Sequence, residues 1–152
     1  DYSHLIPEMM QREGDFVDSQ GNVLGRHRGI AYYTIGQRRG IGIPAENPYY
    51  VLKINPTNQQ ITLGLESELY SRGCVAGEVN WVSVSGIDKE TVVRVKIRYA
   101  TPAVESRLIP LGNGVYKVLF CKEQRAVTPG QSVVCYDDDI LLCGGIIQEV
   151  IE

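Results

Sequence analysis

The chain has 152 residues, of which 43% are hydrophobic and 22% charged, and its net charge is −3. This length suits one globular domain or two small ones. No apolar run approaches the roughly 20 residues of a membrane span, no signal peptide opens the chain, and the net charge alone argues against a nucleic-acid binder. Because the first residue is Asp1 rather than methionine, we expect a fragment or a processed product.

The charge is unevenly distributed. No acidic residue occurs between Ser19 and Ala45, whereas that stretch holds His27 and the arginines at 26, 28, 38 and 39. A basic island on an acidic body can attract a phosphate backbone although the overall pI is low. A chance gap in the acidic residues is the alternative.

The first half predicts one helix and two hairpins. Asp1 to Arg12 predicts a short helix with Ser3 as its N-cap, interrupted by Pro7 in its first turns. Turn-forming residues separate the paired runs 14–18 with 23–28 and 49–54 with 60–65. Residues 29–35 are open between a helical turn and an irregular strand, and 66–70 predict one helical turn. We place the domain boundary at 72/73, which gives domains 1–72 and 73–152.

The second half predicts strands almost throughout. Its clearest period of two runs from 91 to 99, where Val93, Val95, Ile97 and Tyr99 alternate with Arg94, Lys96 and Arg98. Asn113-Gly114 predicts a hairpin turn and Pro129-Gly130 a type II turn. The other predicted strands are 75–84, 103–109, 115–122, 132–136, 140–143 and 145–151. Many short strands separated by turns predict a mostly-β chain that ends in a small antiparallel barrel, and we find no internal repeat.

The residues that often carry chemistry form no recognisable catalytic or metal motif. The cysteines at 74, 121, 135 and 143 lack zinc-site spacing. Since Cys121 and Cys135 lie in apolar strand-like runs, we expect structural thiols in a reducing cytosol. His27, flanked by two arginines, is interpreted as a surface histidine, and the triple aspartate 137–139 as a solvated turn rather than a calcium site.

Two regions are candidates for RNA contact. Arg94, Lys96 and Arg98 are spaced roughly 6.6–7 Å apart on a strand, close to phosphate spacing along RNA. Tyr99 could stack a base, and Gln131 could present its amide from a tight turn. An ordinary solvated strand face and an ordinary turn residue are the alternatives.

The second region is the glycine-rich stretch 33–43, which contains Gln37, Arg38 and Arg39. Its glycines let the backbone come close to a partner, and at least one guanidinium should face water, an acid or a phosphate. A glycine-rich turn with solvated arginines is the alternative.

Six segments of this chain occur in the same order in a known family. Together they resemble the C-terminal part of the tRNA-specific 2-thiouridylases, over nearly the whole chain. They are Gly25-Arg26-His27-Arg28-Gly29, Tyr33-Thr34-Ile35-Gly36-Gln37-Arg38-Arg39-Gly40-Ile41-Gly42, Pro48-Tyr49-Tyr50-Val51, Lys96-Ile97-Arg98-Tyr99, Ala126-Val127-Thr128-Pro129-Gly130-Gln131 and Gly144-Gly145-Ile146-Ile147. Some members carry an older label as tRNA methyltransferases, but we recognise no methyl-donor site.

The resemblance implies a cytoplasmic enzyme that adenylates the wobble uridine of certain tRNAs with Mg-dependent ATP and replaces its 2-oxygen by sulfur. In that family an N-terminal domain binds ATP through an S-G-G-x-D-S loop. Two cysteines act as nucleophile and persulfide carrier. This sequence contains neither the loop nor a cysteine at a matching position. We therefore expect the 152 residues alone to be inactive, with no catalytic residue, metal or cofactor of their own.

The resemblance also implies partners and contact residues. The partners are tRNA and, for the whole enzyme, a sulfur-relay donor protein, with no DNA and no membrane. The implied fold is a central β domain followed by a β-barrel that resembles translation-factor barrels. The family's tRNA contacts carry over to Arg98, Tyr99 and Gln131. Weaker candidates, for RNA or for a contact with the absent catalytic domain, are Gln37, Arg38, Arg39 and Lys96.

Two other hypotheses stay open at the level of sequence. One is a stand-alone RNA-binding β-barrel module without enzymatic partners. The other is a structural or protein-interaction domain whose basic residues only face solvent.

Overall fold

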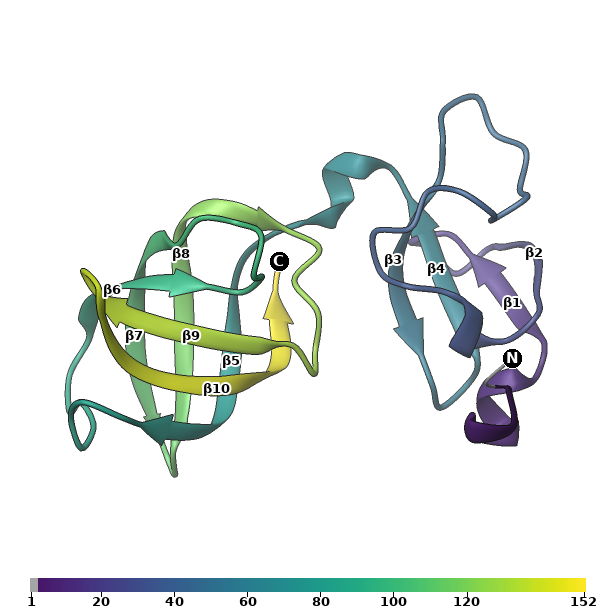
Figure 1. The fold of residues 1–152 in the computed structure, drawn as a ribbon. Coiled ribbons are helices and arrows are strands. Elements are labelled where there is room, and N and C mark those ends of the chain that lie inside the picture. Colours follow the sequence, from purple (N-terminus) through teal and green to yellow (C-terminus); the bar gives the residue numbers. More distant parts are fainter. Residues whose placement is uncertain (1–2) are drawn as a thin grey trace. The chain divides into compact units, whose positions relative to one another are not determined.

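The computed structural model describes residues 3–152 and divides the chain into two compact units, one ending at Leu69 and one beginning at Tyr70 (Figure 1). Both units are built mainly from strands, and the second is a closed barrel. The prediction of a mostly-β chain with two β domains is thereby confirmed. The predicted boundary at 72/73 falls inside β5 (Tyr70–Trp81), the first strand of the second unit.

The first unit contains a four-stranded sheet in the order β2-β1-β4-β3. Two hairpins form it, as the turn residues predicted. They are β1 (Gly14–Val17) with β2 (Val23–His27), and β3 (Tyr50–Asn55) with β4 (Gln60–Gly64). The hairpins join through β1 and β4, which run parallel. A parallel pair needs a long connection between its strands, and β2, the segment 28–49 and β3 together supply one.

Four short 3-10 helices accompany the strands within residues 3–152: η1 (Ser3–Leu5), η2 (Glu8–Gln11), η3 (Ile30–Tyr32) and η4 (Glu66–Leu69). The prediction of one helix over 1–12 is wrong, because Pro7 lacks an N–H and disfavours helical backbone at the residue before it. Asp1, Tyr2 and the side chain of Ser3 lie outside the described part, so the predicted N-cap is not tested. The turn predicted at 66–70 is present as η4.

The barrel has six strands in the closed order β10-β5-β8-β7-β6-β9, and every neighbouring pair is antiparallel. Besides β5 they are β6 (Thr91–Lys96), β7 (Val104–Gly112), β8 (Val115–Arg125), β9 (Ser132–Asp137) and β10 (Ile140–Ile151). Both residues of the predicted Asn113-Gly114 turn have positive φ, of 55° and 73°, as a type I′ hairpin turn requires.

Strand β10 joins two segments, 140–143 and 145–151, that the sequence predicts as separate strands. The sequence predicts a break at Gly144, yet β10 is continuous and shifts its register against β5 on either side of Ile146 and Ile147. Such bulges let a strand bend without ending. At Gly145 a Cβ atom would lie 3.0 Å from the Gly77 carbonyl oxygen, so the glycine permits a close approach of two backbones rather than a turn.

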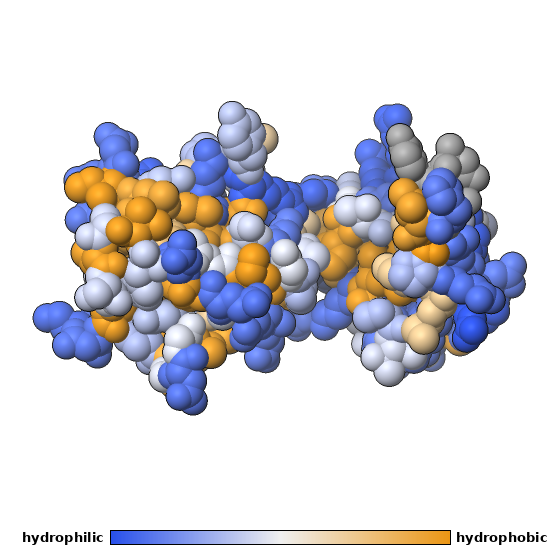
Figure 2. All heavy atoms as spheres, turned by 60° about the horizontal axis from the view of Figure 1, so that its bottom comes forward, coloured by the Kyte–Doolittle hydropathy of each residue, from blue (hydrophilic) through white to orange (hydrophobic). Residues whose placement is uncertain are grey.

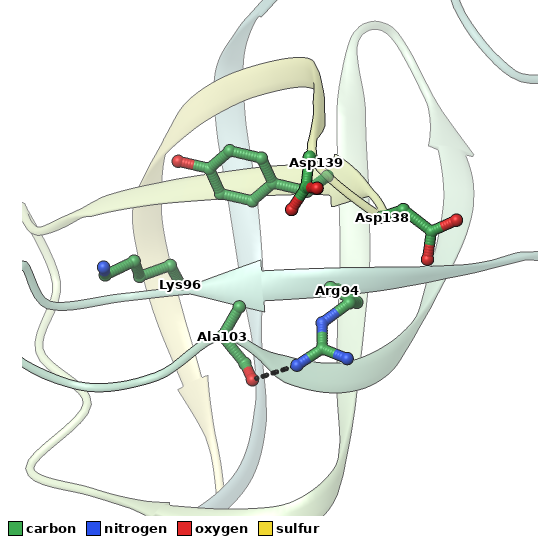
Figure 3. Close-up of a pocket in the computed structure, with 6 residues that line it drawn as sticks. Arg94, Lys96, Ala103, Asp138 and Asp139 are labelled. Carbon is green, nitrogen blue, oxygen red and sulfur yellow. Dashed lines mark hydrogen bonds between the residues drawn. The ribbon is translucent and has the colours of Figure 1, made fainter.

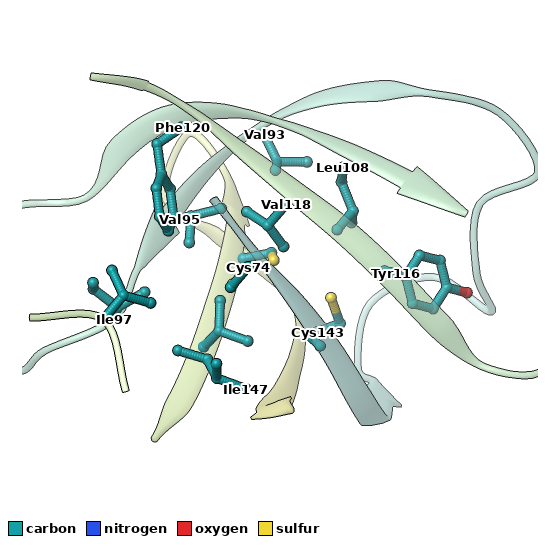
Figure 4. Close-up of a cluster of buried hydrophobic side chains, with 14 residues drawn as sticks. Cys74, Val93, Val95, Ile97, Leu108, Tyr116, Val118, Phe120, Cys143 and Ile147 are labelled. Carbon is teal, nitrogen blue, oxygen red and sulfur yellow. The ribbon is translucent and has the colours of Figure 1, made fainter. Parts of the chain in front are cut away.

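Alternate strand residues fill the barrel interior (Figure 4). Val93 and Val95 of β6 and Val118 of β8 are almost fully buried, together with the thiols of Cys74, Cys135 and Cys143. The expectation that Cys121 is buried is wrong. Because Val118 and Phe120 point inward, the strand period of two turns Cys121 to solvent.

Some apolar side chains remain at the surface (Figure 2). In the barrel, Val82 and Ile140 are each 58% exposed, close to the point where the Val82 amide donates to the Leu142 carbonyl oxygen at 2.8 Å. No helix in residues 3–152 is long and apolar enough to cross a membrane.

Candidate RNA-contact site

Strand β6 carries the basic residues of the first candidate region to one end of the barrel. The strand ends at Lys96, and the buried Ile97 is followed by a turn that contains Arg98 and Tyr99. The sequence predicts a strand over 91–99 in which Tyr99 alternates with Arg98, but the strand stops at Lys96 and the alternation stops with it. The Tyr99 side chain, beyond the strand end, is 97% exposed.

The pairing of β6 with β9 brings two distant segments together. The strands are antiparallel and Lys96 lies opposite Val134. Consequently the residue before β9, Gln131, lies at the same barrel end as the residues after β6. Arg98 contacts the same loop directly, since its Nη2 donates to the carbonyl oxygen of Ala126 at 2.8 Å.

The turn at 128–131 is held firmly against β10. The Gly130 amide donates to the Ile147 carbonyl oxygen at 2.7 Å, and the Ile147 amide donates to the Gln131 carbonyl oxygen at 2.8 Å. The Gln131 amide in turn donates to the Thr128 carbonyl oxygen at 3.1 Å, and Gly130 has a φ of 93°. The predicted type II turn is therefore present.

This turn also fixes the Gln131 side chain. Its Oε1 accepts from the Thr128 amide at 3.0 Å. An N–H can only donate, so the amide oxygen must face Thr128 and the NH2 group is directed away. Gln131 thus offers two donors, which suit a phosphate or a carbonyl oxygen, rather than an acceptor.

Ala126 links Arg98 to the turn. Its φ is 54°, an unfavourable value for a residue with a Cβ atom. In this conformation its carbonyl oxygen accepts both from Arg98 and from the Thr128 hydroxyl, each at 2.8 Å. Arg98 is therefore ordered before any ligand binds.

The chain segment that forms β6 and the turn after it carries only positive charges. No acidic residue occurs in the chain between Thr91 and Val104, whereas three basic ones do. Within residues 3–152 neither Lys96 nor Arg98 forms an ion pair with a carboxylate. The Lys96 ammonium lies 5.6 Å from the centre of the Tyr99 ring, a cation–π distance. Cations, an exposed aromatic ring and amide donors thus gather at one place.

The second candidate region is a braced loop in the first unit. The Gly36 amide donates to Val51 and the Val51 amide donates to Gln37, at 2.8 and 2.9 Å. Gln37 uses both ends of its side chain inside the loop, accepting from the Thr34 amide at 3.0 Å and donating to the Arg39 carbonyl oxygen at 2.8 Å. Arg38 and Arg39 are exposed, so the loop presents its guanidinium groups and not its glutamine.

The turns that end at Gln37 and at Gln131 have the same hydrogen-bond pattern. Thr34-Ile35-Gly36-Gln37 and Thr128-Pro129-Gly130-Gln131 share the side-chain bond to the threonine amide and the pair of backbone bonds to a neighbouring strand. The pattern Thr-x-Gly-Gln is the sequence signal that these two turns share, although four residues are too few to stand out on their own.

His27 is not the surface residue that the sequence predicts. Its side chain is buried, its Nδ1 accepts from the Gly29 amide at 3.0 Å, and its Nε2 bonds to the Gln59 carbonyl oxygen at 2.5 Å. Phe16 and Tyr33 pack edge-on against the ring. The imidazole is thus part of the core of the first unit, whereas Arg26 and Arg28, its neighbours in sequence, are exposed.

Three of the four thiols are buried in the barrel. Burial raises the pKa of Cys74 to about 12, and a hydrogen bond with Cys143 together with burial raises the pKa of Cys135. No three or more His, Cys, Asp or Glu side chains of residues 3–152 gather in a metal-binding arrangement. As predicted, the triple aspartate forms the exposed turn between β9 and β10.

Comparisons with known proteins agree with the division of the chain. A domain family described as the tRNA methyl transferase PRC-barrel domain matches residues 3–65. A second, described as the aminomethyltransferase beta-barrel domain, matches residues 71–147. The first name carries the older methyltransferase label.

Curated relatives named tRNA-specific 2-thiouridylase match across both units. The protein of Clostridium beijerinckii is 46% identical over 140 residues, which cover 92% of this chain and 39% of that protein. The Acetivibrio thermocellus protein is 46% identical over 151 residues, which cover 97% of this chain and 42% of that protein. A Clostridium botulinum protein is 44% identical over 139 residues, covering 91% and 39%.

This chain belongs to the tRNA-specific 2-thiouridylase family, in which it corresponds to the PRC-barrel and β-barrel domains. It spans about two fifths of the length of the curated relatives that it matches.

Proposed function

We propose that this chain is the tRNA-holding part of a cytoplasmic tRNA 2-thiouridylase, which converts the wobble uridine of certain tRNAs to 2-thiouridine. The observation that carries the proposal is the convergence of Arg98, Tyr99 and Gln131 at one barrel end. A guanidinium, an exposed ring and an amide NH2 are the groups that bind phosphate, stack on bases and donate to RNA oxygens.

Each residue has a distinct role in this proposal. Arg98, held by Ala126, contacts a phosphate, and Lys96 adds positive charge beside it. Tyr99 stacks on a base, and the Gln131 NH2 group donates to the RNA. Phosphate contacts supply affinity without sequence information, so the choice of tRNA comes mostly from outside these residues.

Arg38 and Arg39 form a second basic patch, on the braced loop of the first unit. Since Gln37 is engaged at both ends inside the loop, its role is to shape the loop. The two arginines contact a tRNA phosphate or an acidic residue of the catalytic domain.

The chemistry belongs to the whole enzyme. Mg-dependent ATP activates the uridine there, and a persulfide delivered from a sulfur-relay protein supplies the sulfur. The hollow beside Arg94 does not suit ATP, because it also carries the carboxylates of Asp138 and Asp139, which oppose a triphosphate. The 152-residue chain alone is accordingly inactive.

The alternative is a stand-alone RNA-binding β-barrel module, and the coding sequence upstream of Asp1 distinguishes the two. An S-G-G-x-D-S loop and two separated cysteines there support the enzyme. A start codon close to Asp1 supports the module.

Binding itself is tested by titrating the purified chain with unmodified tRNA in a mobility-shift assay at low salt, with duplex DNA of similar length as the control. We expect tRNA to bind and the DNA to compete poorly, because the Tyr99 contact needs an unstacked base. No tRNA binding at low salt, or equal binding of the DNA, would contradict the proposal.

A further inference from the structure

The outer face of the barrel contains an open hollow of about 570 Å³, which shares only Lys96 with the proposed contacts (Figure 3). Its volume falls within the roughly 300–1,000 Å³ of small-molecule sites. Six residues line it: Arg94, Lys96, Ala103, Tyr136, Asp138 and Asp139. Because Val93 and Val95 fill the barrel core, the basic residues that alternate with them face outward into the hollow.

Strand register sets the arrangement of these groups. Arg94 lies opposite Tyr136 in the β6–β9 pair, so a cation and an aromatic ring are neighbours. The Arg94 Nη2 donates to the Ala103 carbonyl oxygen at 3.2 Å, which orients the guanidinium and leaves its other donors for a ligand. Asp138 and Asp139 enter from the tight turn after β9 (Figure 3).

The mixture of charges selects the kind of ligand. Two cations attract an anionic group, but two carboxylates repel a simple anion that fills the hollow. A fitting ligand therefore has an anionic end, a flat aromatic body and an end that donates hydrogen bonds. A guanine nucleotide has all three, since its phosphate is anionic and its Watson–Crick edge offers adjacent N–H donors that a carboxylate can accept together.

We propose that this hollow binds one guanine nucleotide of the tRNA, with the phosphate at Arg94 and Lys96, the base on Tyr136 and its donor edge at Asp138 or Asp139. The inference rests on the proposed tRNA binding and extends its footprint along β6. Arg94 and Lys96 are two strand positions apart, roughly 6.6–7 Å. Arg98 follows in the turn after β6, and the Lys96 ammonium lies 5.6 Å from the centre of the Tyr99 ring. One RNA segment can therefore contact both places.

The probe for the hollow is guanosine 5′-monophosphate, titrated into the isotopically labelled 152-residue chain and followed by amide NMR shifts. We expect saturable shifts at residues 94–96 and 136–139. Uridine 5′-monophosphate should bind about tenfold more weakly, because uracil lacks the second adjacent donor. Inorganic phosphate should produce no saturable shifts. Equal binding of the two nucleotides, or of phosphate alone, would overturn the proposal.

Variants of the exposed turn between β9 and β10 test whether the preference for guanine arises in the hollow. The pair Asp138→Asn and Asp139→Asn should abolish the preference for guanine over uracil, and Asp138, with a φ of 50°, tolerates asparagine well. The control is Asp137→Asn, which removes one carboxylate charge, half that of the pair, from an adjacent exposed residue that does not line the hollow. Equal effects of the control and of the pair would contradict a site in the hollow.

Failure of this inference is distinguishable from failure of tRNA binding. If tRNA binding depends on Arg98 while Arg94→Gln and the aspartate pair bind tRNA and the nucleotides like the unsubstituted chain, the hollow is not a site and the proposed function stands. If guanine binds in the hollow but tRNA does not bind the chain at any salt concentration, the tRNA proposal fails, and the footprint inferred from it fails as well.

Discussion

At the scale of single residues, Tyr99 separates a binding role from a structural one. Its ring is 97% exposed, so removing it costs the fold almost nothing. We predict that Tyr99→Ala weakens tRNA binding by about 1–3 kcal/mol, the usual worth of a base stacked on an aromatic ring, while Tyr99→Phe binds normally. Fluorescence anisotropy with labelled tRNA measures the affinity, and thermal melting provides the control. A change in melting temperature with no change in affinity would contradict the role.

Gln131 and Gln37 occupy equivalent positions in two similar turns, so the same substitution at each can be compared. Gln131→Glu keeps the oxygen that accepts from Thr128 but replaces the outward NH2 donors by a negative charge. We predict an unchanged melting temperature and a loss of tRNA affinity of about 1.5–3 kcal/mol, typical of a hydrogen bond to a charged group. Gln37→Glu should do the reverse in the first unit, because it loses the bond to the Arg39 carbonyl oxygen and lowers stability by about 1–3 kcal/mol. The same result for both variants would contradict this assignment.

Residue identities could be predicted from sequence, but their surroundings could not. The family resemblance indicates Arg98, Tyr99 and Gln131, and the glycines of the turns predict positive φ. The bond from Arg98 to Ala126, 28 residues away, depends on how the strands pair in the closed barrel. The burial of His27 similarly depends on Gln59, 32 residues away. No local pattern contains such information.

At the scale of elements, two glycines of β5 test the barrel packing. A Cβ atom at Gly73 would clash with the Val118 carbonyl oxygen, which is backbone, whereas one at Gly77 would meet only the flexible side chain of Gln148. We predict that Gly73→Ala destabilises the barrel by about 1–3 kcal/mol, as overpacked substitutions do. Gly77→Ala should stay within about 0.5 kcal/mol. Urea denaturation followed by Trp81 fluorescence measures the free energy of unfolding of both variants. Equal values for the two variants would contradict the close packing of β5 on β8 at Gly73.

Strands with one buried face were the easiest elements to predict. In β6 the period of two places Val93 and Val95 inside the barrel as predicted. The continuity of β10 through Gly144 could not be predicted, because a glycine that permits close backbone approach and one that ends a strand look alike in sequence. The parallel pairing of β1 with β4 arises from the packing of two hairpins and has no local signal either.

At the scale of the whole molecule, the cysteines report on one unit only. All four follow Leu69 and therefore lie in the barrel unit. Cys121 is exposed and Cys74, Cys135 and Cys143 are buried. We predict that iodoacetamide at pH 8 labels one thiol quickly, because alkylation needs access and thiolate character, and the other three only on barrel unfolding. Mass spectrometry counts the labels, and rapid labelling of Cys74, whose pKa burial raises to about 12, would contradict a closed barrel.

We propose that the barrel end at Arg98 holds tRNA through its phosphates. The salt dependence of tRNA affinity tests this contact most directly. Losing one phosphate contact should flatten the plot of log K against log salt by about 0.7–0.9. Arg98→Ala should show this change, and Arg98→Lys, which keeps the charge, should restore most of the slope. Lys117→Ala removes a charge from β8 and serves as the control.

A flatter slope is expected for Arg98→Ala alone among these three variants. If Arg98→Ala keeps the slope and the affinity of the unsubstituted chain, or if Lys117→Ala changes the slope as much, this barrel end is not where the chain holds tRNA.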